Sequence, residues 1–404
     1  MSGNWPGGFI TKTAPTVVGP VDGEGGSASG VWTLDQVADY EKQGLWPKPV
    51  IPKELYSWGR NANGQLGLGD TTNRSSPTQV GALTTWSKAA AGGSFSVLIN
   101  SSGELYTTGI NSRGELGLGD TTGRSSPTQV GALTTWLQAA SGNYHSVAIT
   151  TGGTLYAWGY NVSGQLGDGT TTNRSSPVQV GALTDWSQVS VGSQTSLAIK
   201  TDGSLWAWGS SLFGISGTNN AVDYSSPVQI GSLTNWSKVS VGRFHTLSTK
   251  TDGTLWAWGR GTAGALGTGD TTNLSSPTQI GALTNWAQVA AGDRYSLATT
   301  TDGKLYAWGY NLYGQLGIGD TTNRSSPVQV GALTNWLQVA AGFYNSASIK
   351  TDGTLWTWAL NNFGQLGLGD TTQRTSPVQV GALTTWLSIA RMPNANFMLG
   401  IKTT

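Results

Sequence analysis

The sequence predicts an all-β fold, a closed seven-bladed β-propeller built from four-stranded antiparallel blades. The first observation is a repeat, because a Leu-aromatic-x-Trp-Gly signal and a separate lone Trp both return with a period of 50 residues. The second is composition, since 59 Gly and 19 Trp among 404 residues are typical of many short strands joined by tight turns. The third is that the strands predicted at the C-terminal end, within 387–402, supply the two strands that the blade beginning at 54–59 lacks. The signal begins at Leu55, Leu105, Leu155, Leu205, Leu255, Leu305 and Leu355, and the lone Trp is Trp86, Trp136, Trp186, Trp236, Trp286, Trp336 and Trp386.

Each repeat contains four predicted strands. In the unit that begins at Trp236 they span 237–241, 246–250, 255–259 and 277–280. Asp252-Gly253 stands between the second and third strands, and this dipeptide predicts a type I′ hairpin, in which both central residues have positive φ. Small residues in the first strand, such as those at 89–91, predict that this strand is the crowded inner strand of its blade.

The propeller region is predicted to span 54–404. It enters at the third strand of a blade, 54–59, and ends with the first two strands, near 387–390 and 397–402. The C-terminal strands within 387–402 are therefore predicted to pair with 54–59, which completes the seventh blade and closes the ring. An open stack of repeats would need polar caps at both ends, whereas a closed ring leaves only short, protected strand edges.

The repeat carries a family resemblance over residues 54–404. Trp-x-x-Val-x-x-Gly is followed by Asp-Gly-x-Leu-Trp-x-Trp-Gly and then by Asn-x-x-Gly-Gln-Leu-Gly-x-Gly-Asp. This pattern resembles the regulator-of-chromosome-condensation repeat family, and the resemblance implies that family's seven-bladed propeller. The family usually has a His shortly after the Gly of the first strand, and this chain keeps only His145 and His245 in that column.

Residues 1–53 differ from the repeats. Residues 1–29 are predicted to form a flexible tail rich in Gly, Ser and Pro, 30–46 a short amphipathic helix with a capping box at Thr33 and Gln36, and 47–53 a Pro-rich linker. The string 28–47 resembles a short segment of virion structural proteins of tailed bacteriophages. That resemblance implies a virion docking element, and the alternative is a helix that packs on the propeller or ends a linker. The docking residues would be Trp32, Leu34, Val37, Tyr40 and Trp46.

Two short windows vary among otherwise similar repeats. One is the turn after the first strand, which is Asn-Tyr-His from Asn143 and Arg-Phe-His from Arg243, and the other follows the third strand. In an antiparallel blade both turns lie on one face, and the Tyr, Phe and Arg found there are typical of interfaces. We therefore expect a binding face, with relaxed loop drift as the alternative. Its candidate residues are Arg60, Phe95, Tyr144, His145, Tyr160, Phe213, Arg243, Phe244, His245, Arg260, Arg294, Tyr295, Tyr310, Tyr313, Phe343, Tyr344 and Phe363.

Composition and motifs predict a protein without catalytic residues, metal or cofactor. The chain has 11% charged residues, a net charge of +1 and no run of Lys or Arg, which argues against nucleic-acid binding and membrane insertion. There is no Cys, and the 2 His have no evident Asp or Ser partner by spacing. The recurrent Gly-x-Gly-Asp-Thr-Thr loops each offer a single carboxylate, too few for calcium. We therefore expect no enzyme activity.

Two functional hypotheses follow from these observations. The first is a phage virion structural protein, located in the virion, which binds other virion proteins through its N-terminal segment and a host-surface molecule or protein through the variable face. The alternative is a soluble propeller that binds a protein as an inhibitor or scaffold. Nucleotide exchange on a small GTPase, as in eukaryotic relatives, is weaker, because no basic tail or insertion accompanies the repeats.

Overall fold

The computed structural model describes residues 35, 38, 51–390 and 393–404. The chain divides into two compact units, Met1–Pro52 and Lys53–Thr404. The predicted tail, the linker up to residue 50 and the proposed docking residues lie outside the described residues, while Asp35 and Ala38 of the predicted helix are helical. Those docking residues are Trp32, Leu34, Val37, Tyr40 and Trp46. In the described part of the chain, no helix is long and apolar enough to cross a membrane.

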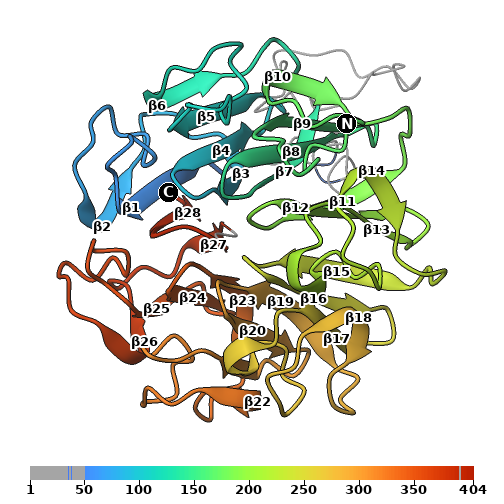
Figure 1. The fold of residues 1–404 in the computed structure, drawn as a ribbon. Helices are drawn as coiled ribbons and strands as arrows, with labels where there is room; N and C mark the ends of the chain where they lie inside the picture. Colours follow the sequence, from blue (N-terminus) through green and yellow to red (C-terminus); the bar gives the residue numbers. More distant parts are fainter. Residues whose placement is uncertain (1–34, 36–37, 39–50, 391–392) are drawn as a thin grey trace, which may run out of the picture. The chain divides into compact units, whose positions relative to one another are not determined.

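The second unit is a closed ring of seven four-stranded antiparallel sheets, as the sequence predicts (Figure 1). Each sheet is one blade, with its first strand nearest the centre of the ring and its fourth strand at the outside. From inner to outer strand, blade one is β27 (Trp386–Ile389), β28 (Phe397–Thr403), β1 (Lys53–Gly59) and β2 (Arg74–Gln79); blade two is β3 (Trp86–Ala91), β4 (Phe95–Asn100), β5 (Leu105–Gly109) and β6 (Arg124–Gln129); blade three is β7 (Trp136–Ser141), β8 (His145–Thr150), β9 (Leu155–Gly159) and β10 (Arg174–Gln179). Blade four is β11 (Trp186–Val191), β12 (Thr195–Lys200), β13 (Leu205–Gly209) and β14 (Tyr224–Gln229); blade five is β15 (Trp236–Val241), β16 (His245–Lys250), β17 (Leu255–Gly259) and β18 (Leu274–Gln279); blade six is β19 (Trp286–Ala291), β20 (Tyr295–Thr300), β21 (Leu305–Gly309) and β22 (Arg324–Gln329); blade seven is β23 (Trp336–Ala341), β24 (Asn345–Lys350), β25 (Leu355–Ala359) and β26 (Arg374–Gln379). The 3-10 turns η1 (Leu212–Gly214) and η2 (Thr262–Gly264) follow the third strands of blades four and five.

Blade one is shared between the two ends of the propeller. The C-terminal strand β28 pairs with β1 along its whole length, from Lys53 opposite Thr403 to Gly59 opposite Phe397. Figure 1 shows the blue strand β1 beside the red strand β28. The two ends of the propeller unit are thus joined by a full antiparallel ladder, and the closure predicted from the spacing of the repeats is present.

The fourth strand of each blade begins earlier than predicted. In blade five it spans Leu274–Gln279, whereas the sequence predicts 277–280. Its pairing with β17 is irregular, because Gly259 lies opposite Leu274 and the next regular pair is Ala257 with Thr278. Pro277 cannot donate a ladder hydrogen bond, and an outer strand with a bulge accommodates such a residue.

The hairpin turns between the second and third strands are not of type I′. Gly253 has φ +76°, but Asp252 is not among the described residues with positive φ. The Gly253 amide donates to the Lys250 carbonyl at 3.0 Å, and the Lys250 amide donates to the Thr254 carbonyl at 3.1 Å. This is the pattern of a type I turn followed by a glycine bulge. The prediction is wrong because the loop is longer than two residues, so only the glycine needs positive φ.

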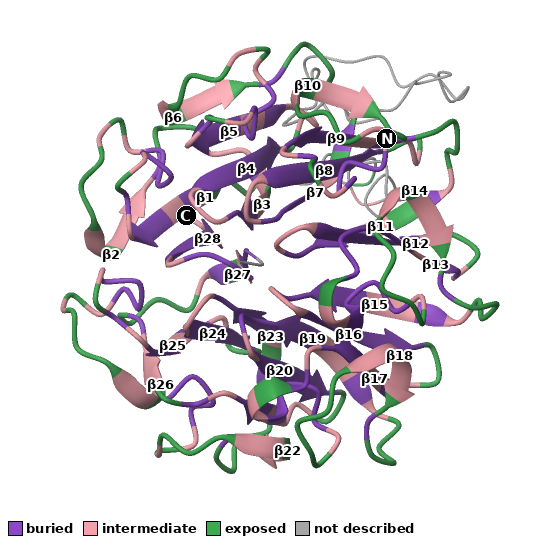
Figure 2. Cartoon of the chain, in the orientation of Figure 1, coloured by how far each residue is buried: buried purple, intermediate pink, exposed green. Residues whose placement is uncertain are grey.

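A column of tryptophans forms the core between neighbouring blades. Trp208 and Trp258 are fully buried, and the Trp258 Nε1 donates to the Ile215 carbonyl of the preceding blade at 2.9 Å. Blade two has Thr108 in this column, and its hydroxyl lies 2.9 Å from the Gly64 carbonyl of the preceding blade and 2.8 Å from the Arg124 carbonyl of its own blade. Figure 2 shows the second and third strands of the blades mostly buried and the outermost strands mostly half-buried. The core is therefore repeated between blades.

Candidate binding face

The two variable windows meet at one end of the blade. In blade five His245, which opens the second strand, pairs with Gly259 at the end of the third strand. Gly259 also pairs with Leu274 at the start of the fourth strand. The turn 242–244 and the long connection 260–273 therefore leave the sheet at the same end. The other blades repeat this arrangement, and we call the resulting surface the variable face.

The structure places most predicted contact residues half-buried on this face, but four of them lie in the interior. Phe95, His145, His245 and Tyr295 are at most 1% exposed, so the prediction that they form surface contacts is wrong. Each begins a second strand, where the side chain reaches the next blade; Tyr295, for example, donates its hydroxyl to the Asn345 carbonyl at 2.6 Å. The half-buried residues are Arg60, Tyr144, Tyr160, Phe213, Arg243, Phe244, Arg260, Arg294, Tyr310, Tyr313, Phe343, Tyr344 and Phe363.

The two histidines join neighbouring blades. His245 Nε2 lies 2.9 Å from Ser296 Oγ in blade six, and Ser296 donates its hydroxyl hydrogen to the Ala265 carbonyl at 2.8 Å. Ser296 must therefore accept from His245, so the hydrogen of the neutral ring is on Nε2. His145 lies 2.9 Å from Ser196 in the same way. Burial lowers the pKa of His145 to about 3 and that of His245 to about 4, so both rings are uncharged near neutral pH.

A continuous series of aromatic and guanidinium contacts crosses blades four to seven. The rings of Phe213 and Phe244 meet edge to face at 5.6 Å between centroids, and those of Phe343 and Tyr344 lie 4.3 Å apart. Arg243 connects the two pairs, because its guanidinium carbon is 4.8 Å from the Phe244 ring centroid and 5.2 Å from that of Phe343. We call this set the aromatic ridge. It comprises Phe213, Arg243, Phe244, Arg260, Arg294, Tyr310, Tyr313, Phe343 and Tyr344.

A buried carboxylate that the sequence analysis did not select lies under the aromatic ridge. The Asp293 side chain has no exposed area; its Oδ1 is 3.3 Å from Arg243 Nη1, and its Oδ2 is 3.4 Å from Arg294 Nε. Burial raises the pKa of Asp293, and the two guanidinium groups oppose that rise. Burial together with the Asp293 charge raises the pKa of Tyr344 to about 12. Arg243 and Arg294 are predicted contact residues, but nothing in the sequence indicates that Asp293 lies between them, because Arg243 comes from the adjacent blade.

A smaller group occupies blades two and three. The guanidinium carbon of Arg113 lies 4.1 Å from the Tyr144 ring centroid and 4.3 Å from that of Tyr160. Glu115 lies buried beneath it and accepts a hydrogen bond from the Arg113 amide at 2.8 Å. Arg113 belongs to the second variable window, yet it is missing from the predicted contact residues. Such stacking on two rings was visible only once the positions of the blades were known.

Blades four and five present their loops differently from the other blades. In blade six Asn311 holds the loop, because its Oδ1 accepts from the Leu316 amide at 3.0 Å and its Nδ2 donates to the Asp320 carbonyl at 3.0 Å. Ser211 and Gly261 stand at the equivalent positions of blades four and five. In these two blades the loop contains a 3-10 turn whose central residue has positive φ, +62° at Phe213 and +61° at Ala263. For a bulky residue this is a strained conformation, and in blade four it places Phe213 in the aromatic ridge.

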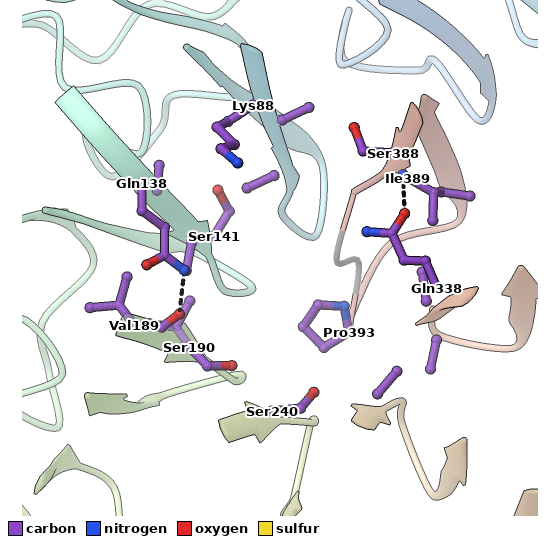
Figure 3. A pocket seen from close by; sticks show the side chains of 18 of the residues that line it. Lys88, Gln138, Ser141, Val189, Ser190, Ser240, Gln338, Ser388, Ile389 and Pro393 are labelled. Atoms are coloured by element: carbon purple, nitrogen blue, oxygen red, sulfur yellow. Dashed lines mark hydrogen bonds between the residues drawn. The ribbon is translucent and has the colours of Figure 1, made fainter. Parts of the chain in front are cut away.

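The centre of the ring encloses a cavity of about 340 Å³ between the inner strands (Figure 3). Gln138 Nε2 donates to the Val189 carbonyl at 3.3 Å, and Gln338 Oε1 accepts from the Ile389 amide at 3.0 Å. These bonds supply partners to backbone groups on the edges of neighbouring inner strands. Within the described residues, no group of three His, Asp or Glu side chains is arranged to hold a metal ion.

The chain is thus a repeat propeller, in which a ring of nearly identical blades carries a variable face rich in aromatic and basic residues. The sequence model of the regulator of chromosome condensation (RCC1) repeat matches residues 54–99, 102–149, 152–199, 202–248, 252–299, 302–349 and 352–390. The chain therefore belongs to the RCC1 repeat family. A second model of the same repeat matches five segments between residues 136 and 365. Comparison with curated protein sequences gives no significant match.

Solved structures show the same fold. Yeast RCC1 (Prp20) bound to Kap60 is similar with a TM-score of 0.79 and 19% identity, over 88% of this chain and 90% of that chain. Human WBSCR16 is similar with a TM-score of 0.78 and 20% identity, over 87% of this chain and 99% of that chain. Prp20p from Saccharomyces cerevisiae, studied for binding to Gsp1p and histones, gives a TM-score of 0.77 and 20% identity, over 88% and 92%.

Proposed function

We propose that this protein is a protein-binding propeller and that the aromatic ridge is its contact surface. The observation that carries the proposal is the unbroken series of ring and guanidinium contacts across blades four to seven of the variable face. Aromatic residues and Arg are enriched in protein interfaces and dominate their binding energy. Yeast RCC1, which shares the fold, has been crystallised with the protein Kap60, and this supports a partner of the same class.

The constant face provides the comparison surface for a test. Leu233 and Leu283 lie in the connections between blades and are 48% and 46% exposed, so they present apolar surface at the opposite end of the blades from the ridge. A ridge variant, Phe244→Ser with Tyr313→Ser, is compared with a control variant, Leu233→Ser with Leu283→Ser. Both pairs remove apolar side chains and leave every Trp of the core in place.

The experiment is quantitative affinity purification followed by measurement with the purified partner. We expect a stoichiometric protein partner to bind the wild type and the control variant alike. The ridge variant should bind at least about 30-fold more weakly, because truncation of one interface hot spot costs about 2 kcal/mol or more. Equal binding by the ridge variant, with loss in the control variant, would place the contact on the constant face and refute the proposal.

A finer second candidate is a structural role in a phage virion, with the protein attached to the particle through its N-terminal segment and its variable face turned outward. The resemblance of the string 28–47 to virion proteins favours it. In this second proposal the protein is located in the virion and acts by binding, without catalysis. Mass spectrometry of purified particles tests it: stoichiometric amounts of the chain are expected, and its absence from particles leaves the inhibitor or scaffold role.

A further inference from the structure

Two arginines of the aromatic ridge share one buried carboxylate. Asp293 lies between Arg243 of blade five and Arg294 of its own blade, at 3.3 Å and 3.4 Å. The Asp293 side chain is fully buried, while the side chains of Arg243 and Arg294 are 32% and 34% exposed. The carboxylate thus holds both guanidinium groups at the surface from below, where it is itself out of reach of a partner.

The charges of this group do not cancel. Two guanidinium groups and one carboxylate leave a net charge of +1 when Asp293 is ionised. Each guanidinium has five N–H donors, and Asp293 faces Nη1 of Arg243 and Nε of Arg294. Within the described residues neither arginine forms an ion pair with a second carboxylate. The remaining donors, including the two terminal nitrogens of Arg294, are available to an anion at the surface.

The surroundings of the arginines are aromatic. Arg243 lies 5.2 Å from the Phe343 ring centroid, and the charge of Arg294 acts on the hydroxyls of Tyr310 and Tyr344. The rings of Tyr313 and Tyr344 are 4.9 Å apart beside them. A charge-assisted hydrogen bond formed next to such rings becomes stronger when a partner covers the site and excludes water.

We propose that Arg243, Asp293 and Arg294 form a receptor for a single Asp or Glu side chain, presented by a protein partner and flanked by apolar residues that pack on the aromatic ridge. The inference rests on the proposed protein-binding function and names the chemistry of its partner. Arg recognises a carboxylate through paired N–H donors in a plane. One carboxylate neutralises the charge that Asp293 leaves uncompensated.

The outer rim of the variable face argues against a polyanionic partner. In blade six the rim Arg324 is bound by its own Asp320 at 2.5 Å and adds no net charge. Blade five has Leu274 where five of the blades have this Arg, so its exposed Asp270 lacks that ion pair; blade four has Tyr224 there. In blades five and six the rim therefore adds no positive charge around the site, and the other arginine of the ridge, Arg260, lies over the Phe213 and Phe244 rings. Such isolated positive charges suit one carboxylate better than a chain of phosphates.

The test uses the full-length protein and a displayed library of random peptides as the probe. Peptides selected on the wild type are expected to carry Asp or Glu beside an aromatic or aliphatic residue. For a selected synthetic peptide, replacing that acid by its amide should weaken binding to the wild type by about tenfold or more, which corresponds to about 1.4 kcal/mol. The same change should alter binding by less than about twofold in Arg243→Gln with Arg294→Gln, because the two effects are coupled.

Two further variants keep the result interpretable. The variant Arg243→Gln, Asp293→Asn, Arg294→Gln removes all three charges, so that no carboxylate is left buried without a partner, and its thermal unfolding midpoint reports the fold. The matched control is Arg60→Gln. Arg60 also stacks on a ring of the variable face, Phe363 at 5.3 Å, but among the described residues it pairs with no buried carboxylate. We expect Arg60→Gln to bind the selected peptides like the wild type.

Four outcomes overturn the inference. Selected peptides without acids would show that the site does not recognise a carboxylate, and so would an unchanged affinity of the amide peptide. In either case the ridge would remain the protein contact if Tyr313→Ala still abolished binding. A third outcome is displacement of the peptide by heparin or a thymidine oligonucleotide, with the steep salt dependence of polyanion binding. That result would show a polyanion site instead of a receptor for one carboxylate. Equal peptide binding by the wild type and the ridge variant would overturn the proposed function as well.

Discussion

The buried histidines should make the stability of the propeller depend on pH in a narrow window. Burial lowers the pKa of His145 to about 3 and that of His245 to about 4, whereas an unfolded chain holds His near its ordinary value of about 6.5. Between these values the unfolded chain binds more protons than the native protein. Stability is therefore complete above about pH 6.5 and falls as the pH is lowered toward 4.

The magnitude follows from proton linkage. At pH 5 protonation of each His stabilises the unfolded chain by about 2 kcal/mol relative to the native protein, because the pKa of His in the unfolded chain lies about 1.5 units above the solution pH. The two sites together remove about 4 kcal/mol between pH 8 and pH 5, a large part of the stability of an ordinary domain. Carboxylates with lowered pKa, such as Asp70, lose their contribution at lower pH.

The matched variant is His145→Phe with His245→Phe. Phe95 occupies the same column in blade two and is fully buried, so the column accepts a phenyl ring. Ser196 and Ser296 keep their own hydrogen bonds to the Gln165 and Ala265 carbonyls. Denaturant unfolding followed by Trp fluorescence at several pH values gives the free energy for both proteins.

We expect the stability difference between the wild type and the double Phe variant to shift by about 4 kcal/mol in favour of the variant from pH 8 to pH 5. The raised pKa values of Asp293 and Glu115 act in both proteins and cancel in this difference. Parallel pH profiles for the two proteins would refute the reasoning, because they would show that His145 and His245 are hydrated or protonated in the native ring.

Three further predictions concern the blades. Gly253→Ala should destabilise the protein by more than Gly281→Ala. Both glycines have positive φ, which costs an alanine about 1–2 kcal/mol. A Cβ at Gly253 would also overlap the Thr284 carbonyl oxygen, whereas a Cβ at Gly281 would meet no atom within 4 Å. Unfolding midpoints measure both, and equal losses would contradict the close approach. Trp258→Ala should cost about 3–5 kcal/mol, since the ring is fully buried and donates to the Ile215 carbonyl; a loss below about 1 kcal/mol in urea unfolding would show that the blades are not held by this column. Exchange of the blade-four loop 210–223 for the blade-six loop 310–323 should leave circular dichroism and the unfolding midpoint near those of the wild type. It should weaken partner binding, because it replaces the turn whose positive φ at Phe213 places that ring in the aromatic ridge, whereas Tyr313 of blade six is not among the described residues with positive φ. Unchanged binding would remove that loop from the contact surface.

The periodicity of the sequence was sufficient for the architecture. The signals at Leu55 and Trp86 recur without insertion, and the count of blades, the shared blade one and the common face of the variable windows all follow from that spacing. Strand boundaries were less well predicted where local chemistry decides them. Pro277 suggested the start of the fourth strand, but the ladder begins at Leu274 and bulges past the proline.

The sequence by itself determined the fold and the face of the propeller on which the repeats differ. The reason is that the number of blades, the positions of the turns and the apolar anchor residues all depend on residues close together along the chain. Only the tertiary structure decided what each variable residue does. His245 reaches Ser296, Arg243 reaches Asp293, and Arg243 stacks on Phe343. These partners stand in the next blade or the one after it. Whether a side chain enters that interface or remains on the face depends on how the blades pack, which the spacing of residues does not specify.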